Sequence, residues 1–469
     1  MSRTAAADSS TVAHEPTHVP RRAWVVLWLA GLSSALPALN LSVMYVLYPE
    51  IEDAFPGVSA ARLSWVLNAY TISSSATLVL GGVIADRWGR KRALLWGCTV
   101  FGLASVLCAM APNVPTIIAG RLIIGPAASL IVTANVSIAL REFPPTRRST
   151  AFGVLASFGG LAAAAGPSLG SVILLGGWRW GFWMNVPISA VIIVLGLRVF
   201  EESRDLTVRR FPDVFSAALL LVSVSLGILA VVQSPTWGWI SATTLGSIAA
   251  SVLLLAAMVW RSLRHPSPIV DLRLFRSRNL SLFNLSSFLV SLGWFGMYLV
   301  LVQFLRTTWD YGLIEAGLLV TPIPFGAGVL GPLCGRYADR VGYRPMLLMG
   351  ALSFAASAVW FITMVDTEPD VAAWMVGIVL VAIGTGLVFP SVQAGSVIGT
   401  PPEQYAIATG LNQTIQRVSS ALGNAIAVAF IASVGIPAAL DRVFVVVLVS
   451  SIAIVGAAAA LTPAREPVG

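Results

Sequence analysis

The sequence contains few charged residues and few of the side chains on which enzyme and metal chemistry depends. Charged residues make up 11% of the 469 residues and hydrophobic residues 57%, a composition that excludes an ordinary soluble domain. Three cysteines, Cys98, Cys108 and Cys334, lie in or beside apolar runs, and their spacing fits neither a metal site nor a disulfide framework. The three histidines fall in the N-terminal tail and one loop. We therefore expect no metal, no cofactor and no intramembrane histidine relay.

Acidic residues are also missing from the middle of the long apolar runs. The 21 Asp and Glu residues map to loops, tails or the ends of runs, whereas Arg121 and Arg417 lie deep within runs. A charge at the bilayer centre costs about 2.5–3.5 kcal/mol on insertion scales, so each arginine should face a cavity or a partner. We expect a solute path that is net positive or neutral. Such a path would accept neutral or anionic molecules better than lipophilic cations.

The excess of basic residues does not indicate a nucleic acid partner. The net charge is +8, but the basic residues are dispersed over many short turns and present no single face to a duplex. A polytopic membrane enzyme would need a catalytic acid, histidine or metal cluster at one membrane face. The histidines lie beside no paired carboxylate, and no Gly-rich nucleotide loop with a phosphate-binding lysine occurs. The sequence therefore argues against a nucleic-acid-binding protein and against a membrane enzyme.

The apolar runs predict an all-α polytopic membrane protein with fourteen transmembrane helices, because a spanning helix needs roughly 20 apolar residues. The predicted spans lie near residues 24–47, 61–84, 93–111, 115–139, 150–174, 181–200, 213–233, 239–260, 280–303, 314–335, 346–365, 371–394, 406–433 and 441–461. An even number of spans places both termini on one side. The loops on that side are rich in arginine and the alternate loops carry acids, so the positive-inside rule places both termini in the cytoplasm of the cell membrane.

One short segment occurs twice. Residues 81–97 (GGVIADRWGRKRALLWG) align without a gap with residues 334–350 (CGRYADRVGYRPMLLMG), and eight of these seventeen positions are identical. Gly153 and Gly166 recur in the same way as Gly410 and Gly423. A duplicated basic hairpin between apolar runs is typical of transporters built from two related halves. We predict two pseudo-symmetric six-helix lobes plus an inserted helix pair, in the order cytoplasmic tail (1–22), first lobe (23–200), inserted hairpin with its linkers (201–278), second lobe (279–461) and cytoplasmic tail (462–469).

The segment 166–170 predicts a bent and closely packed helix. Pro167 lacks an amide donor and clashes with the carbonyl of Ala163, which bends the span at that point. Gly166 and Gly170 are four residues apart and form a face of small residues for close approach of another helix. Such a helix can seal one end of a solute path, and helix packing alone is the simpler explanation of the same pattern.

With these motifs in place, the chain resembles the fourteen-helix drug:proton antiporter branch of the major facilitator superfamily over essentially its whole length. The first-loop signature of that branch appears as Gly82, Asp86, Arg87, Gly89 and Arg90, its fourth-span pattern as Arg121 and Gly125 with Ile124 in place of glutamine, and its antiporter motif as Gly166, Pro167 and Gly170. The runs GWRWGFWMNVP (177–187) and HPSPIVDLRLF (265–275) are similar to further signatures of the branch.

The resemblance implies a gate latch at the first-loop signature. In the family this motif holds one conformation and releases in the other, and Asp339 and Arg340 are expected to form a weaker version in the second lobe, where Tyr343 replaces a base. Control of topology by the positive charges is the simpler alternative.

Five residues are candidates for binding or coupling: Arg121, Asn40, Arg417, Gln416 and Asn412. Asn40 stands where the family has an aspartate implicated in proton coupling or cation recognition; asparagine cannot take up a proton, so a coupled proton would bind elsewhere. Arg121 either acts on the solute or forms a structural hydrogen bond to the backbone or to Asn40. The family often has Arg-Gln where this chain has Gln416-Arg417, which turns Arg417 by about 100° around the helix. Uncharged polar groups such as Asn412 either line the path or bond neighbouring helices.

These observations predict a non-enzymatic transporter. The favoured function is secondary active efflux of a small amphipathic drug or antibiotic, neutral or anionic rather than cationic, by alternating access driven by the proton motive force. The alternatives are a metabolite uniporter or importer without proton coupling in the first span and, with least support, a polytopic membrane enzyme. The expected partners are the small-molecule substrate, a proton and the lipid bilayer; we expect a monomer and no nucleic acid.

Overall fold

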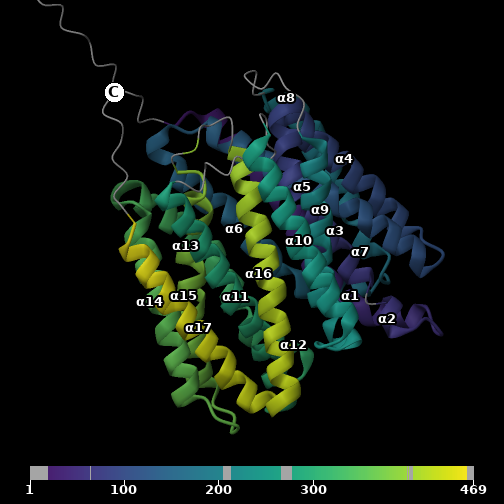
Figure 1. Cartoon of the computed structure of the whole chain (residues 1–469), viewed down its shortest axis with the longest axis vertical. Coiled ribbons are helices and arrows are strands. Elements are labelled where there is room, and N and C mark those ends of the chain that lie inside the picture. Colours follow the sequence, from purple (N-terminus) through teal and green to yellow (C-terminus); the bar gives the residue numbers. More distant parts are fainter. Residues whose placement is uncertain are drawn as a thin grey trace, which may run out of the picture.

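The computed structural model describes residues 19–63, 65–203, 213–265, 277–398, 400 and 405–461. The described residues fold into helices, shown in Figure 1. The helices are α1 (Arg21–Ala54), α2 (Ala60–Leu63), α3 (Trp65–Trp88), α4 (Arg90–Ala109), α5 (Val114–Arg141), η1 (Pro145–Arg147), α6 (Arg148–Leu174), α7 (Trp180–Trp183), α8 (Asn185–Val199), α9 (Val214–Trp237), α10 (Ala242–Arg264), α11 (Arg278–Thr307), α12 (Leu313–Val320), α13 (Pro322–Val341), α14 (Tyr343–Met364), α15 (Val371–Gly395), α16 (Tyr405–Val434) and α17 (Ile436–Ala459).

Eleven segments among the described residues are helices long and apolar enough to cross a membrane. Each coincides with one of the predicted spans, and the remaining three predicted ranges fall on α6, α9 and α16. The predicted span at 314–335 consists of two helices, because α12 ends before Thr321 and Pro322 starts α13. A proline fits this first position, where its missing N–H is not needed by the helix.

The helices form two halves, each with its own hydrophobic core. One core joins α1, α3, α4, α5, α7 and α8 and includes Met44, Phe101 and Phe182. The other joins α11 to α17 and includes Phe304 and Trp374. Figure 1 shows the two groups side by side, with α6 and α16 between them. Two lobes can move against each other only if each has its own core, and this arrangement meets that requirement.

Two pairs of helices, α6 with α13 and α16 with α3, are in close contact across the boundary between the halves. At Gly153 of α6, a Cβ atom would lie 2.2 Å from the carbonyl oxygen of Gly331 in α13. At Gly410 of α16, a Cβ atom would lie 2.7 Å from the carbonyl oxygen of Leu78 in α3. Only glycine permits such close approach of two backbones. The repeated glycines therefore occupy equivalent places in the two halves.

The second repeated pair of glycines packs each of these helices within its own half. A Cβ atom at Gly166 of α6 would lie 2.0 Å from the hydroxyl oxygen of Ser42 in α1. A Cβ atom at Gly423 of α16 would lie 2.2 Å from the carbonyl oxygen of Leu292 in α11. Helices α6 and α16 are thus counterparts that link their own half to the opposite one.

Helices α9 and α10 form a hairpin outside both cores. Side chains of α9, such as Leu220 and Val224, pack against Val79 of α3 and near Leu411 of α16, so the hairpin covers the seam between α3 and α16. Asp213 caps the first turn of α9 and its carboxylate accepts hydrogen bonds from Arg261 of α10 at 2.6 and 3.0 Å. The Arg261 guanidinium holds the pKa of the Asp213 carboxyl well below its usual range. Asp213 is therefore a poor proton acceptor.

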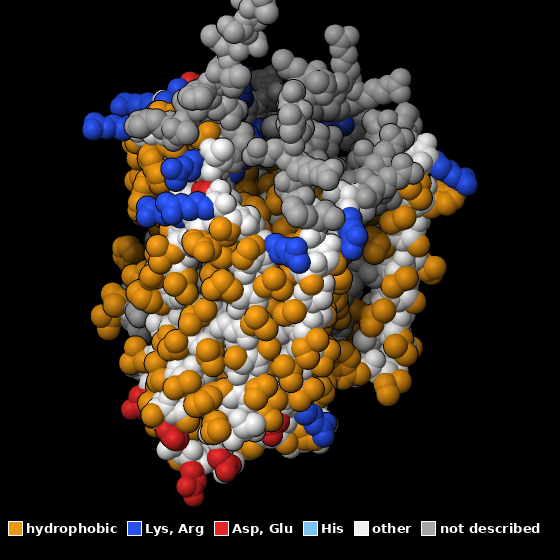
Figure 2. All heavy atoms as spheres, turned by 90° about the vertical axis from the view of Figure 1, so that its left-hand side faces the viewer, with side chains coloured by type: hydrophobic (Ala, Val, Ile, Leu, Met, Phe, Trp, Pro, Cys, Tyr) orange, Lys and Arg blue, Asp and Glu red, His pale blue; other side chains and the backbone are white. Residues whose placement is uncertain are grey.

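Charge is distributed unevenly along the helix axes. Figure 2 shows basic side chains gathered mainly at one end of the molecule, acidic side chains at the other and an apolar band between them. We call these the basic end and the acidic end. The basic end includes three turns: the turn between α3 and α4, the turn between α5 and α6, and the turn between α13 and α14. The acidic end includes the loop 365–370 between α14 and α15. The apolar band has the surface that lipid tails require.

Candidate functional site

The buried arginine of the first half joins three helices. The Arg121 side chain of α5 has no exposed surface. Its Nε donates to the carbonyl oxygen of Val66 in α3 at 2.8 Å, and Nη1 donates to Oδ1 of Asn40 in α1 at 2.8 Å. The guanidinium carbon also lies 4.8 Å from the ring centre of Tyr70. The structure therefore contains both hydrogen bonds that would give Arg121 a structural role.

Asn40 meets Arg121 through a neutral amide oxygen. A carboxylate at this position would form a buried ion pair, whereas the amide makes a hydrogen bond and adds no charge. The predicted pair of residues is thus in contact, and the local net charge is positive.

Asn412 and Gln416 of α16 face α11 within the second half. Asn412 donates to Oδ1 of Asn284 at 3.0 Å and to Oγ of Ser287 at 2.7 Å, and Gln416 donates to Oδ1 of Asn412 at 2.7 Å. Each of these amides is buried. The structure does not bring Asn412 and Gln416 together with Arg121 and Asn40. Their hydrogen bonds hold α16 against α11, which is the role that uncharged polar groups commonly have at lipid depth.

Arg417 lies one position further along α16 and points elsewhere. Its side chain is partly exposed, and no hydrogen bond or ion pair joins its guanidinium to another residue of the described ranges. Arg417 and Arg121 are thus both at mid-helix but in opposite situations, one partly exposed and one enclosed by partners.

The antiporter motif packs on α1, as the small residues at 166 and 170 predict. A Cβ atom at Gly170 would lie 2.9 Å from Cβ of Val46, beside the contact between Gly166 and Ser42. Ser42 donates a hydrogen bond from Oγ to the carbonyl oxygen of Ala163 at 2.8 Å. That carbonyl is the one left without an intrahelical donor, because Pro167 has no N–H. The helix α6 is continuous through residue 167, and the side chain of Pro167 lies outside the described part of the chain.

The second copy of the repeated hairpin holds the two halves together. Asp339, near the end of α13, accepts hydrogen bonds from the backbone N–H groups of Ser149 and Thr150 at 2.9 and 3.2 Å and from the Thr150 hydroxyl. These N–H groups belong to the first turn of α6, which has no side-chain cap from Arg147. A carboxylate at a helix N-terminus satisfies free donors and complements the helix dipole.

Three further side chains complete this contact. The hydroxyl groups of Ser149 and Tyr343 share a hydrogen bond. Arg148 of α6 donates to the hydroxyl oxygen of Tyr405 at the start of α16 at 2.8 Å and lies over its ring. We call the six residues the basic-end clamp: Arg148, Ser149, Thr150, Asp339, Tyr343 and Tyr405. Arg340, which was expected to take part, is exposed.

The first copy of the hairpin turns tightly at Gly89. Gly89 has a φ of 117°, a conformation that glycine adopts readily. Arg90 donates two hydrogen bonds to Asp86 at 3.0 and 2.8 Å, and Glu202 accepts from the backbone of Lys91 at the start of α4. Arg87 is partly buried at the end of α3 and Gly82 is buried within it.

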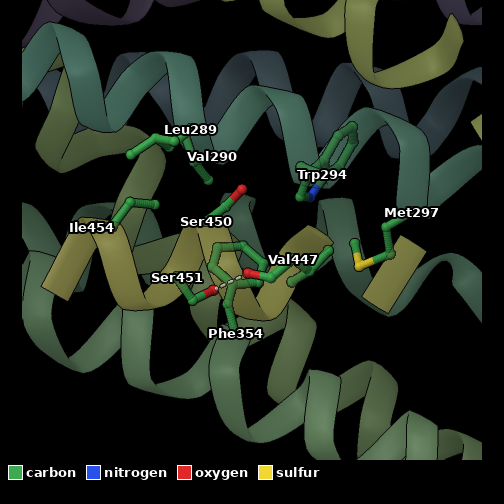
Figure 3. Close-up of a pocket in the computed structure, with 10 residues that line it drawn as sticks. Leu289, Val290, Trp294, Met297, Phe354, Val447, Ser450, Ser451 and Ile454 are labelled. Atoms are coloured by element: carbon green, nitrogen blue, oxygen red, sulfur yellow. Dashed lines mark hydrogen bonds between the residues drawn. The ribbon is translucent and has the colours of Figure 1, made fainter. Parts of the chain in front are cut away.

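An apolar cluster shared by both halves closes the molecule at the basic end. It contains Leu27 of α1, Leu140 of α5, Phe152 of α6, Val397 after α15 and Tyr405 of α16. By contrast, a small cavity between α11, α14 and α17 lies within the second half. Figure 3 shows that it is lined mainly by apolar side chains, with Ser451 bonded to the Val447 carbonyl. This cavity is not a passage between the halves.

A sequence model of the major facilitator superfamily matches residues 24–213 and 283–469. The chain belongs to the major facilitator superfamily. The matched ranges leave out residues 214–282, which contain the α9–α10 hairpin. This family consists of membrane transporters, so the chain is a multi-pass membrane protein of transporter type.

Proteins with resistance or export names match most of the chain. The chain is 26% identical to the multidrug resistance protein Stp of Mycobacterium tuberculosis, over 86% of this chain and 74% of that protein. It is 26% identical to the tetracenomycin C resistance and export protein of Streptomyces glaucescens, over 89% and 78% of the two chains. The multidrug export protein EmrB of Escherichia coli is also 26% identical, over 86% and 79%.

A solved structure confirms the superfamily fold. The crystal structure of the human organic anion transporter MFSD10 (TETRAN) superposes with a TM-score of 0.70 at 16% identity, covering 93% of this chain and all of that chain. At this identity the likeness concerns the fold alone.

Sequence reasoning missed the partners of two motif residues. Asp339 was identified, but Ser149 and Thr150 were not, and Pro167 was identified without Ser42. A Ser-Thr pair shortly after the prolines at 144 and 145 is a signal for a helix start. Nothing in the sequence connects it to a carboxylate 190 residues away.

Proposed function

We propose that the chain exports a small amphipathic drug or antibiotic by alternating access, with neutral or anionic molecules favoured over cations. Family membership and the names of three relatives, each a resistance or export protein, support this direction and substrate class. The absence of a described acid from the middle of the spans, together with Arg121 and Arg417, supports the charge preference.

The observation that carries the proposal is the basic-end clamp. It joins the halves through hydrogen bonds, including those of the Asp339 carboxylate and the Arg148 guanidinium. Such contacts can form and break without unfolding either core. In an arrangement of fourteen spans with cytoplasmic termini, the positive-inside rule makes the basic end cytoplasmic. The structure then corresponds to a transporter closed toward the cytoplasm, and release of the clamp opens it to cytoplasmic drug.

Proton influx is the proposed driving force, worth about 2.3 kcal/mol per charge for each 100 mV of potential. Asn40 and Asp213 are poor candidates for the proton site, the first because it is an amide and the second because Arg261 holds it ionised. A monomer provides both halves of the path, so we propose that the monomer is the transporting unit.

The test is drug susceptibility in a bacterial strain that lacks its own efflux pumps. The wild-type chain should raise the inhibitory concentration of at least one drug about fourfold or more and lower its accumulation. Gly153→Ala should abolish resistance, because the added Cβ would lie 2.2 Å from the Gly331 carbonyl oxygen and prevent closure at the basic end. The matched control is Gly159→Ala, whose Cβ would meet nothing within 4 Å. Resistance that survives equally in both variants, or no resistance to any drug in a broad panel, would count against the proposal.

A metabolite uniporter or importer is the second candidate, and the neutral Asn40 favours it. The two functions differ in their energy source. Export that stops when a protonophore collapses the proton gradient supports antiport, whereas movement that continues down the solute gradient alone supports the uniporter.

A further inference from the structure

We infer that one face of α16, formed by Gln413, Arg417, Ser420 and Asn424, binds the ionised oxygen group of an amphipathic organic anion. The inference rests on the proposed function, because it assigns a substrate class and a place to the solute path. We call these four residues the α16 polar face. None of the residues discussed above as holding α16 to its neighbours belongs to it.

The spacing of the four residues places them on one side of the helix. They are separated by four, three and four positions, which is the repeat of a single helix face. Gln413 and Arg417 are partly exposed, Asn424 is exposed, and Ser420 is buried. An exposed asparagine and a partly exposed arginine in the middle of such a helix require water or a polar ligand beside them.

A second face of α16 is occupied by α11. Asn412 bonds Ser287, the Ser419 hydroxyl donates to the Phe288 carbonyl oxygen, and Gly423 approaches the Leu292 backbone. At about 100° per residue this face lies roughly 110° from the centre of the α16 polar face. The α16 polar face therefore does not point into the core of the second half.

A third face of α16 points to the outside of the bundle. Ile407, Leu411 and Val418 pack in the cluster that α3 and α9 form, and α9 covers the seam between the halves from outside. This face lies about 130° around the helix from the α16 polar face. The polar face is thus turned to the inner side of the seam between the halves.

The chemistry of this face selects an anion. Arg417 offers five N–H donors with a permanent positive charge, and Gln413, Ser420 and Asn424 add neutral polar groups on both sides of it. The described acids within helices of the same half, Glu315, Asp339 and Asp441, all lie near the ends of their helices, and the other described acids lie in loops, so none can neutralise Arg417 from mid-depth. A carboxylate or sulfonate would match the guanidinium by charge-assisted hydrogen bonds, and a cationic drug would be repelled.

The experiment compares a fluorescent acid with its ester on the purified full-length chain in lipid nanodiscs. The probes are 7-diethylaminocoumarin-3-carboxylate and its ethyl ester, read by fluorescence polarisation, with the cation rhodamine 6G as a third probe. The wild type should bind the acid more tightly than either other probe. Arg417→Gln should weaken acid binding by about tenfold or more and leave the ester unchanged, the loss expected for a hydrogen bond to a charged group.

Two further variants separate charge from folding. Arg417→Lys should retain part of the acid binding, because it keeps the charge but not the planar donor set. Arg306→Gln removes an exposed arginine at the end of α11 and should change nothing. Equal acid binding in wild type and Arg417→Gln, or no preference of the wild type for the acid over the ester, would overturn the inference.

The outcome is distinguishable from failure of the proposed function. Drug resistance without Arg417-dependent binding of the acid would leave export standing and remove the anion site. Arg417-dependent binding without resistance to any drug would leave the site standing and remove drug export.

Discussion

Each half of the molecule has an arginine within a long helix, and the surroundings of the two arginines differ. In the first half, Arg121 is enclosed and bonded to Asn40 and Val66. In the second half, Arg417 is partly exposed and bonded to no described side chain. A charged side chain that is hydrogen-bonded within its own half holds helices together. A partly exposed charged side chain without such partners is available to bind a ligand.

The two copies of the basic hairpin also make different contacts within the described part of the chain. Asp86 binds Arg90 one turn away in its own half, whereas Asp339 crosses to the first turn of α6 in the other half. Among the described residues, the first copy thus contains a pair that braces its own turn, and the second copy contains a contact that joins the halves.

The largest effect is expected for Arg121→Ala, which breaks the internal network of the first half. The change leaves the buried Asn40 oxygen without its donor and opens a cavity, at a cost of about 3 kcal/mol or more. Purified yield and melting temperature in detergent should both fall sharply. Arg417→Ala is the matched control and should melt like the wild type. Equal losses in the two variants would contradict the comparison of the halves.

The next largest effect is expected for Asp339→Asn, which weakens the contact between the halves. Loss of the carboxylate at the N-terminus of α6 should cost about 1–2 kcal/mol and shift the population toward the form open at the basic end. The labelling rate of an Ala151→Cys reporter, buried in the closed basic end, should rise about fivefold or more. Arg340→Gln on the same helix should leave the rate unchanged, and a rate unaffected by Asp339→Asn would argue against the clamp.

A smaller effect is expected for Ser42→Ala, which removes the donor to the Ala163 carbonyl. The cost should be about 1 kcal/mol in the free energy of unfolding, the usual net value of a hydrogen bond. In a Pro167→Ala background, the restored backbone N–H bonds that carbonyl within α6, so the same change should cost almost nothing. A double-mutant cycle of unfolding free energies measures this coupling. Strictly additive losses would show that the Ser42 hydroxyl does not compensate for Pro167.

The smallest effect is expected for Asp213→Asn, in the hairpin that belongs to neither half. Asparagine preserves the helix cap and removes the ion pair with Arg261, so the loss at neutral pH should be below about 1 kcal/mol. Because Arg261 lowers the pKa of Asp213, the stabilisation is present above the ordinary aspartate value of about 3.9 and is lost as pH falls below it. Melting curves of both proteins should therefore converge at acidic pH. A difference that persists there would exclude the ion pair as its source.

Local patterns in the sequence were sufficient for much of the fold. The lengths of the apolar runs predicted helices that the structure contains, and the repeated glycines at 153 and 410 marked equivalent crossings of the halves. The spacing of Gly166 and Gly170 predicted a close helix contact without naming the partner. These features depend on neighbours along the chain, which the sequence contains directly.

The sequence did not show which neighbouring helix each polar side chain of α16 faces. Asn412, Gln416 and Arg417 were grouped as candidate binding residues, yet the first two bond along α16 and to α11 while the third is turned away. A rotation of about 100° per residue separates them, and only the position of α11 determines which face is covered.

The amino-acid sequence by itself determined that this chain is a helical membrane protein with a repeated half, because hydrophobicity, helix period and glycine placement act over short distances. Tertiary structure alone decided that Arg121 is hydrogen-bonded to Asn40 and Val66 whereas Arg417 is partly exposed. It also decided that Asp339 accepts hydrogen bonds from the first turn of α6, and that Ser42 donates to the Ala163 carbonyl, which Pro167 leaves without an N–H partner. These contacts join residues 55 to 190 positions apart, and they follow from how the helices pack.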